Sequence, residues 1–543
     1  MPEAKADFLR ACDPHRTAMR VLAWLTIFRL LYLIPFTAQF DLAGDESYYW
    51  EWGRRLDWGY FSKPPMIGWL MGLVGRLTNN TEWGIRGAAL LLGTGSLFFL
   101  HRLANKLFGA RAALLALLLC ALTPANALLN LVLTIDAPLV LCWTAALLVF
   151  WCAMEQPNKV SRWIVLSVIL GLGHLSKQMM LFFPVLMILH CAFNPPSRAL
   201  LRRASFWICI AGSLLFLVPV LWWNAQHGWV TLTHTSHHFE TRSDPGLLGH
   251  LATLGEFLSL QALAFSPVTW VLMLAAVFGG LWKWHVLGEK ERYAVMFSGP
   301  GLAVFILLSY RQSVNVNWPA VYYISAIVLA GAWLDRVALD ALPWQRLRGW
   351  ARPAVITGLG VSLISCILPF AISALGQEGT SLDPAMRLRG WRDAGVQAGA
   401  LLAKVPRPSR TFVVIYGDRS HASQLAFYMP QQPQVFRFVR EGITESQYEL
   451  WPDPGDLDRF SWDALMIMPS ENLEPQSQEV PSSLRRQFRH MIDLGPISVP
   501  LGHEAGRSYK VFLAKNLRSW IRPPVIDPSA PPESPEPGAA MPK

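Results

Sequence analysis

The sequence predicts a polytopic α-helical membrane protein that carries a small α/β domain near its C-terminal end. Of its 543 residues, 52% are apolar and only 15% are charged, whereas about a quarter of the residues of an average soluble protein are charged. Apolar stretches of membrane-spanning length recur as far as residue 375. Beyond that point the composition becomes polar, with short strand-like and helix-like patterns.

About eleven stretches have the length and composition of a membrane-spanning helix, which needs roughly 20 apolar residues to cross a core about 30 Å thick. The fifth and sixth stretches are short, so the count is open by about two. We expect spans at about 18–37, 84–103, 110–125, 136–154, 162–177, 178–193, 204–222, 264–283, 293–309, 318–335 and 354–375.

The distribution of lysine and arginine predicts the orientation, because basic residues in short loops are enriched on the cytoplasmic side. Loops on the side of the N-terminus are rich in them, as in the 102–111 segment, and the opposite loops hold few. With an odd number of spans, residues 44–65 and everything after residue 375 then lie outside, in the periplasm of a bacterium. We therefore expect a multi-pass protein of the bacterial inner membrane. The net charge of +10 fits this topology signal, so we expect no nucleic-acid partner.

Three parts follow from this layout: a transmembrane part (1–375), a periplasmic soluble α/β domain (376–522) and a disordered Pro-rich tail (523–543). The tail has too few apolar residues to fold. Within the soluble domain we expect buried strands at 412–418 and 463–469 and a helix at 421–429.

A polar stretch, GDESYYWEWGRRLDWGYFSKPP at 44–65, directly follows the first span. It begins with the acidic pair Asp45 and Glu46 and ends near Lys63. Charge beside a hydrocarbon slab is costly, so an acidic pair at this place indicates a functional site. The alternative is an interfacial loop, because tryptophan and tyrosine are common at membrane interfaces.

Further polar residues fall on the same predicted face, so they can share one cavity with this stretch. Asp136 in TIDAPLV lies at the mouth of the fourth span, and Lys177 in HLSKQ ends the fifth. The long loop 222–263 adds a histidine cluster and Arg242. Simpler explanations stay open: Asp136 can cap a helix, Lys177 can extend to the interface, and Arg242 can contact lipid headgroups.

Two carboxylates with lysine and arginine on one face suit a particular chemistry. Cations hold a lipid-linked phosphate through charge-assisted bonds, and a carboxylate deprotonates or orients a hydroxyl that attacks an anomeric carbon. The sequence has no GxxxxGK[ST] phosphate loop, which a donor already carried across the bilayer on a lipid would explain. The segment THTSHHFETRSDPG lacks the i, i+4 histidine pair of a strong metal motif. We expect no cofactor, and a divalent metal stays the alternative.

Several motifs, in order, resemble bacterial family 39/83 glycosyltransferases of the GT-C superfold. These relate to protein mannosyltransferases, lipid A aminoarabinose transferases and Rgt-type transferases. GDESYYW with GYFSKPPMIGWL resembles the family's first external loop, and TIDAPLVLCW its second acidic motif. GLGHLSKQ resembles the phosphate-side lysine segment, HHFETRSDPG the third loop, and VNWPAVYY at 316–323 a later loop. GDRSHASQLAFYMP and SQYELWPDP resemble a subgroup, so the likeness covers nearly the whole chain.

The resemblance assigns a role to each candidate residue. It implies a GT-C catalytic domain, a catalytic carboxylate with an acidic neighbour, and cations that contact the donor phosphate. The sugar is left open, because the arginine that aminoarabinose enzymes favour soon after the acidic pair is missing. The implied roles are catalytic for Asp45, Glu46 and Asp136, donor-phosphate binding for Lys63, Lys177 and Arg242, and substrate cavity for Tyr49, His238, Glu240 and Asn317.

The activity implied is that of an inverting hexosyl- or pentosyltransferase. Such an enzyme moves a sugar from a polyprenyl-phosphate donor to a periplasmic acceptor. The expected acceptor is lipid A, lipopolysaccharide or another envelope glycolipid. Two alternatives stay open. A protein acceptor shares the chemistry, although no MIR repeats are present. A flippase for lipid-linked saccharides would instead keep its charges near the midplane of the membrane.

Overall fold

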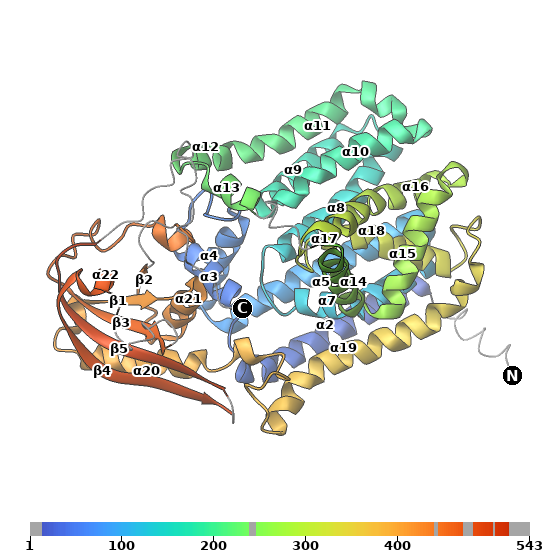
Figure 1. Ribbon diagram of the computed structural model, residues 1–543. Coiled ribbons are helices and arrows are strands. Elements are labelled where there is room, and N and C mark those ends of the chain that lie inside the picture. The colour runs from blue at the N-terminus through green and yellow to red at the C-terminus, as the bar shows by residue number, and fades with distance from the viewer. Residues whose placement is uncertain are drawn as a thin grey trace.

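The computed structural model describes residues 13–237, 246–438, 444–470, 480, 482–502 and 505–520. A helical bundle carries a five-stranded sheet at one end, with the short helices α3 (Gly44–Arg54), α4 (Met66–Thr78) and α21 (Arg419–Tyr428) between them (Figure 1). This agrees with the predicted combination of a membrane bundle and a C-terminal α/β unit.

Every one of the predicted spans is helical. Side-chain caps begin several of the helices: an Asp13 oxygen accepts the His15 N–H at 3.0 Å, and Thr81 accepts the Gly84 N–H at 3.3 Å. The helices of the predicted spans are α2 (Pro14–Gln39), α5 (Glu82–Phe108), α6 (Ala110–Ala121), α8 (Asp136–Glu155), α9 (Val160–Ser176), α10 (Phe182–Phe193), α11 (Ala204–Leu214) with α12 (Val218–Gln226), α15 (Pro267–Trp282), α16 (Glu289–Met296) with α17 (Gly299–Arg311), α18 (Ala320–Leu334) and α19 (Ala351–Ala374).

Length and composition alone qualify seven helices in the described ranges as membrane spans, or eight with one bent pair included. The bent pair is the predicted sixth span, which continues into a 3-10 helix at Pro195–Arg202 after a turn of 119°. Four other predicted spans, α6, α9, α15 and α18, are apolar helices of 10–17 residues. The number of spans therefore stays a prediction.

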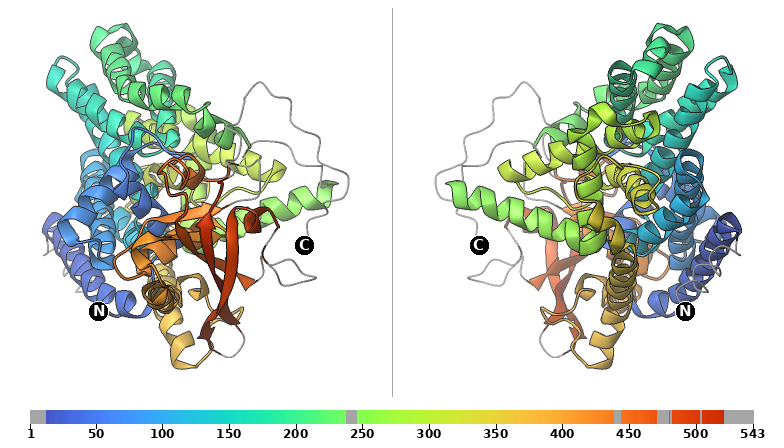
Figure 2. Two further views of the ribbon diagram at one scale, coloured as in Figure 1. Left: turned by 90° about the vertical axis from the view of Figure 1, so that its left-hand side faces the viewer. Right: turned by 90° about the vertical axis from the view of Figure 1, so that its right-hand side faces the viewer.

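The expected loop 222–263 is wrong in part, because most of it is helical. After α12 come α13 (Val230–His237) and α14 (Gly246–Phe265), and α14 is one of the seven long apolar helices. Helix α14 points along the line of sight in Figure 1, where α8, α11 and α19 run across the picture, and it extends sideways in Figure 2. It therefore lies across the bundle, and we do not add it to the predicted spans.

The C-terminal sheet has the strand order β2-β1-β3-β5-β4. Strand β1 pairs in parallel with β2 and β3, and β5 pairs antiparallel with β3 and β4. The predicted strands and helix at 412–418, 463–469 and 421–429 correspond to β1, β3 and α21, and the other three strands were not predicted. The strands are β1 (Thr411–Tyr416), β2 (Val435–Phe438), β3 (Asp463–Pro469), β4 (Phe488–Leu501) and β5 (Ala505–Leu517), with α20 (Trp391–Lys404) and α22 (Ser482–Arg485) beside them.

Helix α3 belongs to the same hydrophobic core as the C-terminal domain. Its Tyr48, Trp50 and Trp52 are buried together with apolar residues of α21 and the sheet. Polar contacts join the same surfaces: the Ser47 and Ser423 hydroxyls are 2.9 Å apart, and the Gln447 N–H donates to the Tyr48 hydroxyl at 2.6 Å. The first half of the polar stretch, α3, is thus a largely buried helix held by the C-terminal domain, and a loop follows it from residue 55 to residue 65.

Candidate active site

The candidate site lies at the end of the bundle that faces the C-terminal domain. It draws side chains from the first turn of α3, the loop before α4, the start of α8, the residue after α9, the segment before α18 and the start of α21. These segments lie far apart in the sequence, and the fold brings their charged groups together.

Asp136 and Lys177 form the buried part of the site. Asp136 begins α8. Its carboxylate accepts a hydrogen bond from the Lys177 ammonium at 2.8 Å and another from the Asn317 amide at 2.7 Å. Asp136 is 8% exposed and Lys177 is 7% exposed. Because both carboxylate oxygens bind other side chains, helix capping is not what Asp136 does, and Lys177 does not extend to the interface. The predicted cavity residue Asn317 lies in the same cluster.

Lys63 lies close to this pair. The pKa of the Lys63 ammonium is lowered to about 8, first by burial and then by the nearby charge of Lys177, while Asp136 opposes the shift. The charges of Asp45 and Arg419 also act on it. The Lys63 charge therefore interacts both with the buried pair and with the more exposed Asp45 and Arg419. A bound anion would stabilise the charged form of Lys63.

Asp45 is the exposed carboxylate of the site, with 55% of its side chain accessible. It lies in the first turn of α3, where a negative charge suits the helix dipole. Its Oδ1 is 3.6 Å from an Arg419 guanidinium nitrogen. This distance is too long for a strong hydrogen bond, so the Asp45 carboxylate stays available to a substrate group.

Glu46, predicted as catalytic, is placed differently from Asp45. It is 1% exposed, and its two oxygens accept the Ala43 N–H at 2.9 Å and the Leu133 N–H at 3.0 Å. Burial raises the pKa of its carboxyl, while the charge of Arg86 and the two N–H donors oppose the rise. Glu46 ties the start of α3 to the segment before α8, an arrangement suited to positioning Asp45 against Asp136.

Tyr49 feels the charges of both aspartates. It is buried, and burial raises the pKa of its hydroxyl, as do the charges of Asp45 and Asp136, against the opposing charge of Arg419. Its ring packs edge-on against Trp52 at a centroid distance of 5.0 Å. Its predicted role in the substrate cavity stays a prediction.

His238, Glu240 and Arg242 lie outside the described residues. Their predicted roles in the substrate cavity and in phosphate binding therefore stay predictions. Among the residues that the structure does describe, no group of three or more His, Cys, Asp or Glu side chains is arranged to hold a metal ion.

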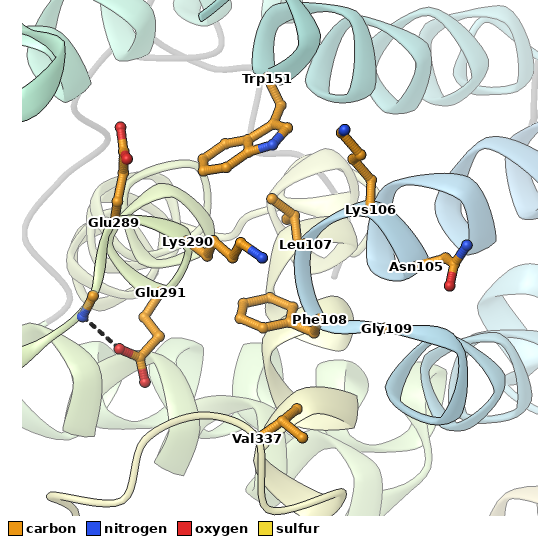
Figure 3. Close-up of a pocket in the computed structure, with 11 residues that line it drawn as sticks. Asn105, Lys106, Leu107, Phe108, Gly109, Trp151, Glu289, Lys290, Glu291 and Val337 are labelled. Carbon is orange, nitrogen blue, oxygen red and sulfur yellow. Dashed lines mark hydrogen bonds between the residues drawn. The ribbon is translucent and has the colours of Figure 1, made fainter. Parts of the chain in front are cut away.

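A cavity of about 690 Å³ lies at the opposite end of the bundle (Figure 3). Trp151, which lines it, is fifteen positions after Asp136 in α8, a rise of about 22 Å along a helix. None of the predicted site residues that the structure describes lines the cavity. Glu291 is already bound to the Gly288 N–H, the dashed contact in Figure 3, and the remaining lining residues include Asn105, Lys106, Phe108, Glu289, Lys290 and Val337. The cavity is therefore separate from the candidate site.

Sequence reasoning missed Arg419. It begins α21 in the C-terminal domain, directly after the capping residue Asp418. The motif GDRSHASQLAFYMP contains Arg419, but in the sequence it indicates only a resemblance to a subgroup of the family. Its contact with Asp45 depends on how the domain docks, and a periodicity or spacing pattern does not carry that information.

Comparisons with known proteins give a family profile and a relative that match this chain. Residues 62–223 match the profile of the family described as dolichyl-phosphate-mannose-protein mannosyltransferase. The chain is 24% identical over 446 residues to the lipid A galacturonosyltransferase RgtD of Rhizobium johnstonii, covering 80% of this chain and 87% of the relative.

Among solved structures, the chain is similar to ArnT of Cupriavidus metallidurans, with a TM-score of 0.60 in the apo state and 0.59 with bound undecaprenyl phosphate. Both alignments have 18% identity and cover 91% of this chain, with 98% and 97% of the ArnT chains.

The fold and the relatives support one class of protein, the membrane glycosyltransferases with the GT-C fold. Within this class, the chain is similar in sequence to RgtD and in fold to ArnT.

Proposed function

We propose that this protein transfers a sugar from a polyprenyl-phosphate donor to a glycolipid acceptor of the lipid A type, at the periplasmic face of the inner membrane. Similarity to RgtD, named as a lipid A galacturonosyltransferase, supports the acceptor. Similarity to an ArnT structure bound to undecaprenyl phosphate supports the donor.

The observation that carries the proposal is the combination of two lysines with two differently placed carboxylates. Lys63 and Lys177 supply positive charge where a phosphate enters, and charge-assisted bonds from lysine to phosphate are strong. Asp136 holds Lys177 in place, while Asp45 remains exposed. One group of side chains thus offers both a phosphate site and a free base.

The reaction follows from these roles. An acceptor hydroxyl attacks the anomeric carbon on the face opposite the leaving group, and its proton passes to the Asp45 carboxylate. The new carbon–oxygen bond forms as the bond from the anomeric carbon to the phosphate oxygen breaks. Polyprenyl phosphate leaves with the electron pair, and Lys63 and Lys177, with Arg242, stabilise its charge. The configuration at the anomeric carbon is inverted.

A protein acceptor is the second candidate. The matching family profile carries the description of a protein mannosyltransferase, and it covers the segment from Ser62 through Asp136 and Lys177. The donor chemistry is the same for both acceptors, so the acceptor has to be identified by experiment.

Mass spectrometry of a deletion strain tests the proposal. Lipid A, core oligosaccharide and envelope proteins are compared between the parent, the deletion strain and a strain complemented with the wild-type chain. We expect one sugar to disappear from lipid A or another envelope glycolipid and to return on complementation. Loss of a sugar from a protein alone would favour the second candidate, and unchanged glycans in all three fractions would contradict both.

A further inference from the structure

The guanidinium of Arg419 comes from the C-terminal domain and lies beside the exposed carboxylate of the site. One of its nitrogens is 3.6 Å from Asp45 Oδ1, and its carbon lies 4.9 Å from the centre of the Tyr48 ring. A third of the side chain is exposed. Its charge also acts on Lys63 and Tyr49, so it belongs to the same group of charged side chains.

The position of Arg419 is fixed from several sides. Asp418 caps α21, because its Oδ1 accepts the Ser420 N–H at 2.8 Å and the Ser420 hydroxyl at 2.6 Å. The Asp418 carboxylate therefore binds the start of α21 through Ser420. The hydroxyl pair Ser47 and Ser423 then holds α21 against α3. Such a preorganised cation costs little to orient when a ligand binds.

Donors of this guanidinium remain available. Within the described ranges, Asp45 is the one ion-pair partner of Arg419, and the pair is long for a hydrogen bond. Arginine presents five N–H donors in a planar fork that matches a carboxylate or a phosphate group. Lys177, in contrast, is bound to Asp136 at 2.8 Å.

The charges of the site also leave room for a second anion. Three cations, Lys63, Lys177 and Arg419, lie near the carboxylates of Asp45 and Asp136. Asp418, on which the Arg419 charge also acts, is bound to Ser420, and Glu46 is bound to backbone N–H groups. The donor phosphate uses the lysine side of the site in the proposed function. The Arg419 side is left to a different anionic group.

We propose that Arg419 is a specificity-determining residue that binds an anionic group of a substrate, other than the donor phosphate, beside Asp45. This inference rests on the proposed function. The group is a carboxylate on the transferred sugar or a phosphate on the acceptor glycolipid. Either one would compete with Asp45 for the guanidinium, and Asp45 would then be free of its cation when it accepts the proton.

The test compares purified full-length wild type, Arg419→Gln and Arg419→Lys. One arm uses polyprenyl-phosphate donors that carry a uronic acid or the matching neutral hexose, with one acceptor. The other arm uses lipid A with or without its phosphates, with one donor. We expect Arg419→Gln to raise KM for the anionic substrate about tenfold or more, with a smaller change in kcat. Arg419→Lys should recover part of the loss, and the neutral counterpart should be used as by wild type.

The arm in which the effect is found identifies the source of the anionic group. Arg392→Gln is the matched control, because Arg392 is another arginine of the C-terminal domain and pairs with Glu82 of the bundle at 2.9 Å. It should lower thermal stability without changing the preference for the anionic substrate. Equal losses on anionic and neutral substrates, or no loss in either arm, would overturn the inference while leaving the proposed function intact. If the wild type transferred no sugar, the inference and the proposed function would both be contradicted.

Discussion

The two aspartates of the site are chemically similar and structurally different. Asp136 is buried with both oxygens bound, whereas Asp45 is more than half exposed and loosely paired. A general base has to reach the hydroxyl proton of a substrate. The exposed Asp45 meets that condition, and the bonded Asp136 serves better to hold Lys177.

Replacing Asp45 with asparagine tests this division of roles. Asp45→Asn keeps the shape and removes the basicity, so turnover should fall by about 10² to 10⁴-fold, the usual contribution of a positioned base. The donor dissociation constant should stay within about twofold, since the lysines are untouched. Transfer from purified polyprenyl-phosphate sugar in detergent measures the first, and equilibrium binding the second. Near wild-type turnover would move the role of base to Asp136.

Lys63 predicts a pH dependence of donor binding. Its pKa in the free protein is lowered to about 8, so it loses its positive charge as the pH rises through that value. Binding of the donor phosphate should therefore be about tenfold weaker at pH 9 than at pH 7. Lys63→Arg keeps a cation at both pH values and should flatten the profile. A profile that is the same in both proteins would show that another group titrates.

The sequence predicted the residue types of the buried cluster well. Asp136, Lys177 and Asn317 each stand out as polar positions beside apolar runs, and the structure places Lys177 and Asn317 at the two carboxylate oxygens of Asp136. Arg419 is an ordinary charged residue near a helix start. Only the docking of α21 gives it a place beside Asp45, across 374 positions of sequence, and so it could not be predicted.

At the scale of elements, α3 and α21 approach each other closely. A Cβ atom added at Gly44 would lie 2.8 Å from the Cβ of Ser420, closer than two such carbons approach. Gly44 begins α3 directly before Asp45. The spacing between the two helix starts therefore determines how Arg419 meets the carboxylate.

A pair of substitutions tests this contact. Gly44→Ala should destabilise the protein by about 1 to 3 kcal/mol through overpacking and should reduce transfer activity as α21 is displaced. Ser420→Gly in the same chain removes the clashing carbon, so the double variant should recover most of both losses. Thermal unfolding in detergent and the transfer assay give the two measurements. Additive effects in the double variant would show that the helices do not press on each other here.

Helix α14 shows where pattern reasoning fails. Its leucines are largely exposed, among them Leu247, Leu248 and Leu263, and its composition equals that of a span. The polar segment before it favours a loop, so the sequence pattern predicts one long loop at 222–263 that includes the residues of α14. Because α14 lies across the bundle (Figure 2), its surroundings and not its composition distinguish it from a span.

At the scale of the whole molecule, the bundle and the C-terminal domain meet through buried and partly buried polar contacts as well as a shared core. Asp41 accepts the Trp391 N–H at 2.7 Å, Arg392 pairs with Glu82 at 2.9 Å, and Tyr428 donates to Glu82. The change of composition after residue 375 predicted that a second unit exists. It could not predict that this unit completes the site, since the partners lie more than 300 positions apart.

The orientation of the whole molecule is the premise of the proposed reaction. Asp57 and Gly417 belong to the end that holds the site, where the Trp223 indole donates to Asp57 at 2.7 Å and the Gly417 carbonyl accepts Arg437. Gly109 lines the cavity at the other end (Figure 3). A donor that crosses the bilayer on a lipid requires the site end to face the periplasm.

Reporter fusions determine this orientation. Alkaline phosphatase joined after Asp57 or Gly417 should be active, since it folds only outside the cytoplasm, and a fusion after Gly109 should be inactive. The bias of lysine and arginine toward the Gly109 side, with Arg102, Lys106 and Arg111 close by, gives the physical reason. A cytoplasmic reporter joined at the same three positions is the control and should show the reverse pattern. If the fusions after Asp57 and Gly417 reported opposite sides of the membrane, the two parts of the site could not lie together. If all three fusions gave the reverse of the expected pattern, the donor would have to be presented in the cytoplasm.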